Sequence, residues 1–255
     1  MKNLNFLFVL AISAQLIVAQ NRPKPEETEV WEPEPRLVRP GQNNGAPSDA
    51  IVLFDGTDLS KWKSERDGSE AKWTVNDDGS MTVKPGSGDI VTKDEHGSIQ
   101  LHIEWKSPIE ITGDGQGRGN SGIIFQRRYE VQVLDSYNNR TYSNGQAASI
   151  YKQSIPLVNA MRPTGEWQVY DIVFMEPKYD AAGKMTAPGR FTVFHNGILV
   201  QNNVEIKGTT EYIGAPKTGR DEMPGYGSNT RTERYLLLQD HSNHVSYRNI
   251  WMRKL

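Results

Sequence analysis

The chain has no cysteine among its 255 residues. Disulfide bonds and cysteine-based catalysis are therefore excluded, and an exported form could not carry a lipid anchor on a cysteine. Acidic and basic residues almost balance, with 29 Lys and Arg against 31 Asp and Glu. Because this balance offers no electrostatic attraction to polyanions, we expect neither nucleic acid nor an anionic membrane as a partner.

Helical periodicity is also missing, since no window sustains it over three turns. The sequence has no HExxH metal motif, no glycine-rich phosphate loop and no G-x-S-x-G nucleophile elbow. These absences exclude the usual sequence forms of zinc peptidases, nucleotide-binding folds and α/β-hydrolases.

The one long apolar run lies at the N-terminus. Lys2 precedes a largely apolar stretch over residues 6–18, and the small residue Ala19 follows that stretch. The run is short for a membrane span, so residues 1–19 are predicted to be a signal peptide that is cleaved after Ala19. We expect export across the inner membrane, with the periplasm as the destination.

Residues 20–49 contain six of the fourteen prolines together with many charges, which favours an extended leader over a packed element. From residue 50 the sequence pattern changes to short runs of apolar and β-branched residues that are separated by turn residues. Such runs occur at 51–54, 72–75, 80–83, 99–105, 121–126, 129–134, 168–174, 191–194, 198–200, 235–238 and 245–251. This spacing predicts one all-β domain over residues 50–255, an antiparallel sandwich.

Two long segments interrupt the predicted strands. Residues 135–163 are rich in Asn, Tyr, Ser and Gly, and residues 207–233 are rich in Gly, Thr and charge. Unstructured insertions of this length in a compact domain usually cover a functional site or carry one.

The run Tyr129-Glu130-Val131-Gln132-Val133-Leu134-Asp135 is the strongest candidate for a site. Strand periodicity places Glu130 and Gln132 on one face of the sheet, and Asp135 on the other unless a bulge intervenes. A carboxylate and a carboxamide side by side can bind a sugar and transfer its protons. The same pattern also suits the solvated face of an ordinary sheet.

Several short strings stand out at 53–62, 119–125, 129–135, 165–172, 194–197, 238–241 and 245–250. In this order and spacing they together resemble one family, the domain of unknown function 1080, now called the 3-keto-disaccharide hydrolase domain. The resemblance implies a concanavalin A-like jelly roll, secretion into the periplasm, and action on sugars oxidised at C3. The chain departs from the family pattern at Ser242-Asn243-His244, where a Gly-Asn-Pro-like turn is expected, and in a longer segment over 214–231.

Cleavage of a 3-keto-glycoside requires a base near C2, because the ketone acidifies the C2 hydrogen. It also requires a donor or metal at the enolate oxygen and an acid at the leaving oxygen. Glu130 is the candidate base, with a structural sheet-face carboxylate as its alternative reading. His241 is the second catalytic candidate and lies on the same side as Gln239, whereas Asp240 points away; a surface histidine is the alternative.

The remaining candidates would bind substrate, although each residue also has a structural reading. They are Asn120, Gln132, Tyr151, Lys152, Trp167, Gln239 and Arg248. A divalent metal is a further hypothesis, with Glu130, Asp135 and His241 as its ligands, but their spacing is not diagnostic. His96, His102 and His195 are interpreted as structural.

We therefore expect a secreted enzyme that cleaves 3-keto-glycosides, with an oxidised carbohydrate as its partner. Two alternatives stay open. One is an ordinary retaining glycosidase that uses Glu130 and Asp135, and the other is a non-catalytic glycan-binding module on the same fold.

Overall fold

The computed structural model describes residues 23–225 and 233–255. The predicted signal peptide over residues 1–19 lies outside the described residues. The chain divides into two units, Met1–Leu37 and Val38–Leu255. Within the first, the described part contains one 3₁₀ turn, η1 (Pro25–Glu27), and its side chains are exposed. Across the described ranges, no helix is long and apolar enough to cross a membrane.

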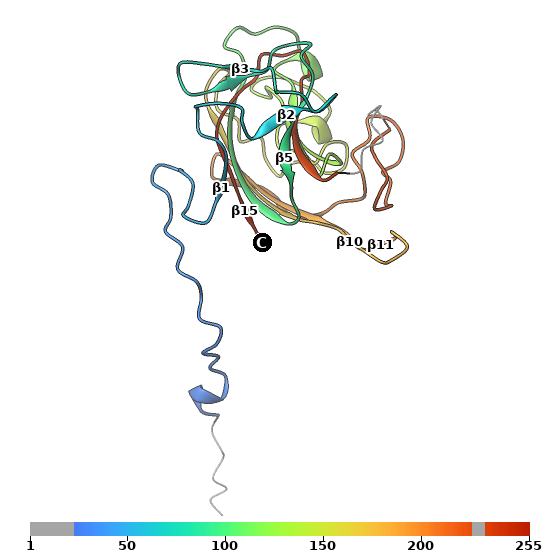
Figure 1. Ribbon diagram of the computed structural model, residues 1–255. Helices are drawn as coiled ribbons and strands as arrows, with labels where there is room; N and C mark the ends of the chain where they lie inside the picture. The colour runs from blue at the N-terminus through green and yellow to red at the C-terminus, as the bar shows by residue number, and fades with distance from the viewer. Residues whose placement is uncertain (1–22, 226–232) are drawn as a thin grey trace, which may run out of the picture. The chain divides into compact units, whose positions relative to one another are not determined.

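The second unit is a sandwich of two antiparallel sheets (Figure 1), which confirms the predicted all-β jelly roll. The eight-stranded sheet runs in the order β13 (Ile198–Glu205), β12 (Arg190–His195), β9 (Gln168–Met175), β6 (Ile99–Lys106), β15 (Ser246–Lys254), β4 (Met81–Thr82) and β3 (Thr74–Val75), and β1 (Ile51–Phe54) also pairs with β15. The five-stranded sheet runs β2 (Trp62–Ser64), β5 (Ile90–Glu95), β14 (Tyr235–Leu238), β7 (Ser121–Phe125) and β8 (Tyr129–Val133).

Smaller elements decorate the sandwich. The hairpin of β10 (Lys178–Tyr179) and β11 (Met185–Ala187) projects from its edge (Figure 1). Two 3₁₀ turns, η2 (Gly115–Gly117) and η3 (Ser143–Gly145), lie in the loops beside β7 and β8. The sequence patterns missed β2, β5, β10 and β11, because these strands are short or mix charges into their runs.

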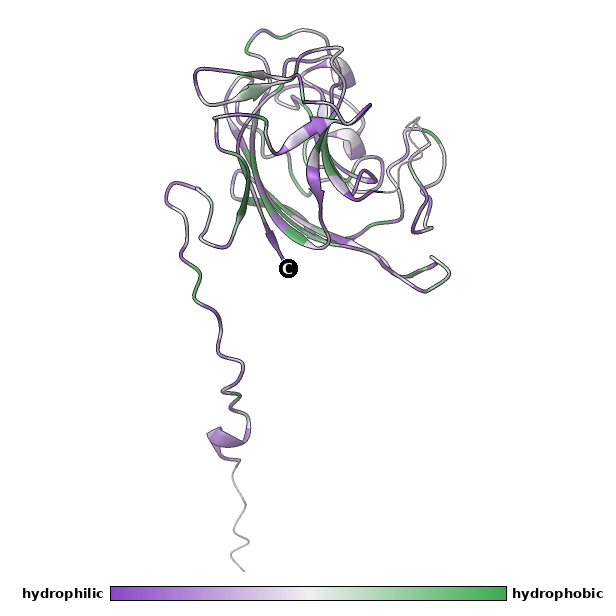
Figure 2. Cartoon of the chain, viewed as in Figure 1, coloured by the Kyte–Doolittle hydropathy of each residue, from purple (hydrophilic) through white to green (hydrophobic). Residues whose placement is uncertain are grey.

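The core lies between the two sheets and is built by strand alternation. On β6, Ile99, Leu101, Ile103 and Trp105 are fully buried, while the intervening residues face outward. Figure 2 shows the hydrophobic residues concentrated on the strands, with the connecting loops mostly hydrophilic. Burial of each large apolar side chain contributes roughly 1.5–3 kcal/mol. This core is the main source of stability in a chain that cannot form disulfides.

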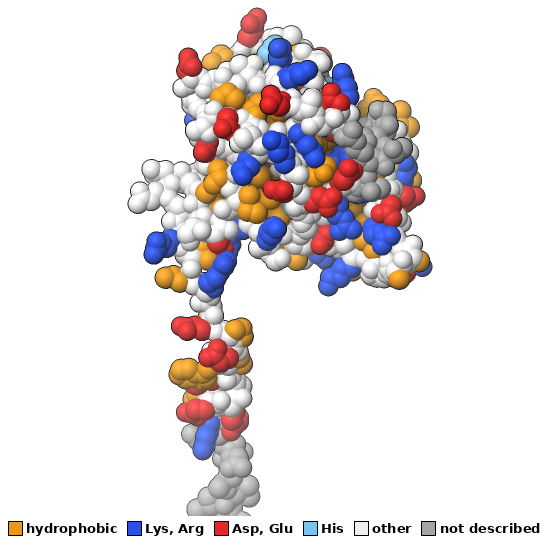
Figure 3. Space-filling view, in the orientation of Figure 1, with side chains coloured by type: hydrophobic (Ala, Val, Ile, Leu, Met, Phe, Trp, Pro, Cys, Tyr) orange, Lys and Arg blue, Asp and Glu red, His pale blue; other side chains and the backbone are white. Residues whose placement is uncertain are grey.

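The surface carries both charge signs. On the face of the sandwich shown in Figure 3, acidic and basic side chains are interspersed. This mixture follows from the near balance of the composition.

Strand β8 is buried on both of its faces. Tyr129, Val131 and Val133 pack in the core, and Glu130 and Gln132 lie on the opposite face of the five-stranded sheet. Tyr151 and Tyr212 from the long loops line a cavity on that second face, and the Tyr151 backbone amide donates to the Glu130 carbonyl at 3.0 Å along the edge of β8. The prediction that Glu130 and Gln132 share a face is confirmed, and both side chains are buried rather than on a freely solvated face.

The compact unit begins at Val38, earlier than the predicted domain start at residue 50. The Asn44 carbonyl accepts hydrogen bonds from Asn249 Nδ2 at 3.1 Å and Trp251 Nε1 at 3.0 Å. Both guanidinium contacts from Arg253 to the Asp49 carboxylate measure 2.8 Å. Residues 38–49 therefore belong with the domain, because β15 supplies partners that are distant in sequence.

The histidines interpreted as structural occupy two environments. Burial lowers the pKa of His96 to about 4 and that of His195 to about 3, so both are neutral core residues. His102 instead lies on the outer face of the eight-stranded sheet, 2.7 Å from Asp171 Oδ1 and 3.6 Å from Glu104 Oε1. Burial alone would lower its pKa, but hydrogen bonds and charge from Asp171 and Glu104 outweigh burial and raise the pKa to about 9.

His102 should make stability fall at alkaline pH. Between about pH 6.5 and 9 the folded state holds a proton that the unfolded state releases, so this stabilisation is lost as pH rises through about 9. From pH 7 to 9.5 we expect the free energy of unfolding to fall by about 2 kcal/mol more than in His102→Gln. Urea unfolding at both pH values measures this difference, and parallel losses in the two proteins would contradict it.

Candidate active site

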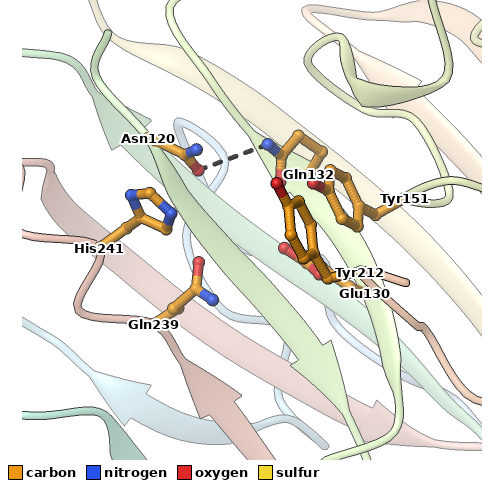
Figure 4. Close-up of a pocket in the computed structure, with 7 residues that line it drawn as sticks. All are labelled: Asn120, Glu130, Gln132, Tyr151, Tyr212, Gln239 and His241. Atoms are coloured by element: carbon orange, nitrogen blue, oxygen red, sulfur yellow. Dashed lines mark hydrogen bonds between the residues drawn. The ribbon is translucent and has the colours of Figure 1, made fainter. Parts of the chain in front are cut away.

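A cavity of about 240 Å³ lies on the face of the five-stranded sheet opposite the core. Figure 4 shows the seven residues that line it: Asn120, Glu130, Gln132, Tyr151, Tyr212, Gln239 and His241. They come from the start of β7, from β8, from the two long loops and from the segment that follows β14. Six of these seven residues are predicted site residues, and Tyr212 is the addition.

Glu130 lies at the floor of the cavity and its carboxylate lies over Gly122 of the neighbouring strand. A Cβ atom at Gly122 would stand only 2.6 Å from Glu130 Oε1 and 3.4 Å from Gln239 Oε1. With its amide group turned toward Glu130, Gln132 donates to Glu130 Oε1 at 3.0 Å and to the Ser121 carbonyl at 3.3 Å. The glycine therefore provides the space and Gln132 the orientation for the carboxylate.

Gln239 and His241 approach Glu130 from the opposite side of the cavity (Figure 4). The Gln239 backbone N–H donates to the Gly122 backbone carbonyl at 3.0 Å, and Ser121 Oγ donates to the Gln239 backbone carbonyl at 2.6 Å. The buried Tyr247 hydroxyl donates in turn to Ser121 Oγ at 2.6 Å. This chain of hydrogen bonds fixes the backbone before the exposed His241.

Asp240 points away from the cavity, as strand alternation predicted. Its Oδ2 accepts from the Gly88 amide and its Oδ1 from the Ser242 amide, each at 2.9 Å. Asp240 therefore ties the turn after β14 to the distant backbone at Gly88, and these contacts do not orient His241.

Aromatic side chains from the long loops form the wall beside Glu130. The hydroxyl oxygens of Tyr142 and Tyr151 are 2.5 Å apart, and Lys152 Nζ lies 5.0 Å from the Tyr142 ring centre and 4.7 Å from that of Tyr212. Burial, the bond to Tyr142 and the Glu130 charge raise the pKa of Tyr151 far above its ordinary value. Tyr151 is consequently a neutral hydrogen-bond donor, and Lys152 stands beside the cavity rather than in its lining.

Asn120 closes the end of the cavity near Gln132. Its Nδ2 donates to the Gln116 carbonyl at 2.7 Å. In the side-chain orientation drawn in Figure 4, its Oδ1 accepts from Gln132 Nε2 at 3.4 Å, and turning the Gln132 amide toward Glu130 replaces this contact. Asn120 therefore bonds to the backbone of the loop before β7 and also lines the cavity.

Arg248 and Trp167, predicted to bind substrate together with the residues of this cavity, do not line it. Arg248 Nε bonds to Glu104 Oε2 at 2.6 Å on the outer face of the eight-stranded sheet. The Trp167 ring centre lies 4.1 Å from the Arg248 guanidinium carbon and 4.6 Å from Lys106 Nζ. The reason is sheet membership, since β15 and β9 belong to the other sheet.

The predicted metal ligands are not brought together. Asp135 follows the end of β8 and bonds to Arg118 Nε at 2.9 Å and Thr164 Oγ1 at 2.8 Å, outside the cavity lining. Within residues 23–225 and 233–255, no three His, Asp or Glu side chains are grouped to hold a metal ion. The three-ligand arrangement of Glu130, Asp135 and His241 is therefore wrong, because Asp135 pairs with Arg118.

Sequence reasoning missed Tyr212, Tyr142 and Gly122. Two of them lie in the insertions that were expected to cover or carry a site, but no pattern distinguishes them from other loop tyrosines. Gly122 lies inside one of the strings that carry the resemblance, although strand patterns do not show which side chain needs the space.

A jelly-roll sandwich with a cavity of carboxylate, imidazole, amide and phenol groups fits the class of carbohydrate-active enzymes. Residues 49–253 match the family model described as a 3-keto-alpha-glucoside-1,2-lyase-like domain, and the chain belongs to this family. This confirms the resemblance drawn from the sequence strings. A search among curated proteins returned no match.

Solved structures from Parabacteroides distasonis resemble the chain. One, assigned provisionally as a glycosyl hydrolase, is 49% identical with a TM-score of 0.82, and the match covers 91% of this chain and 97% of that one. Two others with the same assignment are 21% and 20% identical, with TM-scores of 0.55 and 0.52. These two matches cover 81% of this chain and 94% and 99% of the others, and they support the fold.

Proposed function

We propose that the protein cleaves the glycosidic bond of 3-keto-glycosides, with Glu130 as the base and His241 as the acid. The observation that carries the proposal is the Glu130 carboxylate, the single one among the described lining residues, which faces an imidazole across a cavity of about 240 Å³. Both are side-chain types that exchange protons near neutral pH. The family supports the choice of an oxidised sugar as substrate.

In the proposed reaction Glu130 removes the C2 hydrogen as a proton, and the electron pair passes to the C3 oxygen as an enolate. When the enolate collapses, the C1–O bond breaks and the leaving oxygen takes a proton from His241. Water then adds across the C1–C2 double bond. Its hydroxyl goes to C1, its proton restores His241, and Glu130 returns its proton to C2.

The neutral groups around Glu130 suit the enolate step. Tyr151 keeps its proton because its pKa is raised, so its hydroxyl can donate to a developing oxyanion. Amides of Asn120, Gln132 and Gln239 can bind sugar hydroxyls on either side of the ring. Hydrogen bonds hold the side chains of Asn120 and Gln132 and the backbone of Gln239 before substrate arrives.

A retaining glycosidase would need two carboxylates about 5–5.5 Å apart at the scissile bond. Glu130 is the single carboxylate among the described residues that line the cavity, and Asp135 is bonded to Arg118 elsewhere. This arrangement favours a substrate whose own ketone supplies the acidity at C2.

The proposal is tested with matched oxidised and unoxidised disaccharides, each with and without a chelator. We expect release of the 3-keto sugar from the oxidised substrate alone. Turnover of the unoxidised disaccharide would support a retaining glycosidase, and saturable binding without turnover would support a glycan-binding module. Loss of activity with the chelator, restored by a divalent metal, would add a metal to the site.

His241→Ala should lower kcat on a sugar leaving group by about a hundredfold, because the departing alkoxide then lacks its proton donor. The loss should almost vanish with a 4-nitrophenyl 3-keto-glucoside, whose leaving group needs no proton. His241 is exposed, so stability should not change. Equal losses on both substrates would contradict the role as acid.

We further propose that residues 1–19 are removed on export to the periplasm. Mass spectrometry of protein from the periplasmic fraction should show Gln20 as the first residue.

A further inference from the structure

A second cavity, of about 460 Å³, adjoins the candidate active site. It is formed by the segments 107–112, 117–119 and 242–244, with Asp135 at its floor. Cavities that bind small molecules commonly measure about 300–1,000 Å³. The second cavity therefore has room for a sugar ring that the smaller first cavity cannot also accommodate.

At two places in the chain, one residue lines the first cavity and its neighbour in sequence lines the second. Asn120 lines the first cavity and Gly119 the second, while His241 lines the first and Ser242 the second. Consecutive Cα atoms are about 3.8 Å apart, so at both places a single peptide group links the lining of one cavity to that of the other. A substrate that occupied both would place its connecting bond beside His241, where the proposed acid is needed.

The floor of the second cavity is electrically neutral. Arg118 Nε lies 2.9 Å from Asp135 Oδ2, which also accepts from Thr164 Oγ1 at 2.8 Å. The Asp135 carboxylate is 1% exposed, so the ion pair is shielded beneath the surface. Because the two charges compensate each other, this floor does not select a charged ligand, and the exposed Glu110 on the rim disfavours an anionic one.

The rim combines polar and apolar groups. Ser242, Asn243 and Thr112 offer hydroxyl and amide groups, and Ile111, with 57% of its surface exposed, adds an apolar face. Hydrogen-bonding groups beside exposed apolar surface match a sugar ring, which has hydroxyls at its edge and apolar C–H faces.

We propose that this second cavity binds the leaving group of the substrate, a second, unoxidised sugar ring. The inference rests on the proposed function, because it assigns the other half of the same glycoside. It also gives a role to Ser242-Asn243-His244, the turn that departs from the family pattern. These residues would set which leaving groups this chain accepts.

The test compares a 3-keto-disaccharide with the methyl 3-keto-glucoside of the same anomeric configuration. His244→Ala and Ile111→Ser change exposed side chains of the rim and should fold normally. In each variant we expect kcat/KM for the disaccharide to fall about tenfold while that for the methyl glycoside stays within twofold. Glu205→Gln, an exposed change on β13, is the control and should affect neither substrate.

Equal effects of the rim variants on both substrates, or none on either, would overturn the second cavity as the leaving-group site. If the wild type cleaves neither substrate, the proposed function fails, and binding of free glucose by saturation-transfer NMR becomes the deciding readout. Binding that is weakened by His244→Ala supports the assignment. Binding that is absent, or unchanged in that variant, overturns it.

Discussion

Replacement of Glu130 by glutamine is expected to lower kcat on a 3-keto-disaccharide by about a thousandfold. Glutamine keeps the size of the side chain and can still bond to Gln132, but it cannot accept the C2 proton. Positioned acid–base groups typically contribute 10²–10⁴-fold to a rate. Steady-state kinetics measure the loss, and KM should change much less than kcat because the shape of the cavity is retained.

Two comparisons make the result specific to the proton transfer. Exchange of the C2 hydrogen with deuterated solvent, followed by NMR, should disappear together with turnover. Glu205→Gln removes an exposed carboxylate on the other sheet and should keep full activity. A Glu130→Gln enzyme that retained a tenth of the wild-type rate would refute the assignment of Glu130 as the base.

The substitution Gly122→Ala should lower kcat by about one hundredfold without changing any group that reacts. The new methyl group would stand 2.6 Å from Glu130 Oε1, so the carboxylate must move. A displacement of about 1 Å of a catalytic group can cost about 10²-fold in rate. The folded state should tolerate the change. Alanine has less conformational freedom than glycine in the unfolded chain, so ordering it in a strand costs about 0.5–1 kcal/mol less free energy.

Gly97→Ala is the matched control for this prediction. A Cβ atom there would stand 2.9 Å from Glu176 Oε1, so it also pushes on a carboxylate, but one that bonds to Arg234 away from the cavity. Activity measurements and thermal unfolding of both variants separate displacement of Glu130 from a general packing effect. Similar losses of activity in the two variants would contradict the role of Gly122.

The strand patterns predicted most of the large elements because their side chains alternate between core and outer face. Strand β8 is the clearest example, since the positions of Glu130 and Gln132 follow from period 2. Strand β5 was missed because its exposed half, Lys93-Asp94-Glu95, interrupts the apolar run. Local composition cannot show that such a strand is paired on both sides by β2 and β14.

The site residues divide in the same way. Gln239 and His241 follow β14, and antiparallel pairing of β14 with β7 brings them to the face that carries Glu130. Arg248 follows an equally suggestive pattern, but its strand pairs with β6 in the other sheet, and its guanidinium group bonds to Glu104. Period 2 sets the face of a residue within its own strand and leaves open which sheet that strand joins.

By itself, the sequence determined the all-β class, the family, and the pair of Glu130 and Gln132 on one face. These features depend on the local alternation of apolar and polar residues and on short sequence strings that occur in a fixed order along the chain. Only the tertiary structure decided that Tyr212 joins the cavity, that Asp135 pairs with Arg118, and that Arg248 and Trp167 lie on the other sheet. Those outcomes depend on contacts between segments far apart in the chain, which local patterns do not encode.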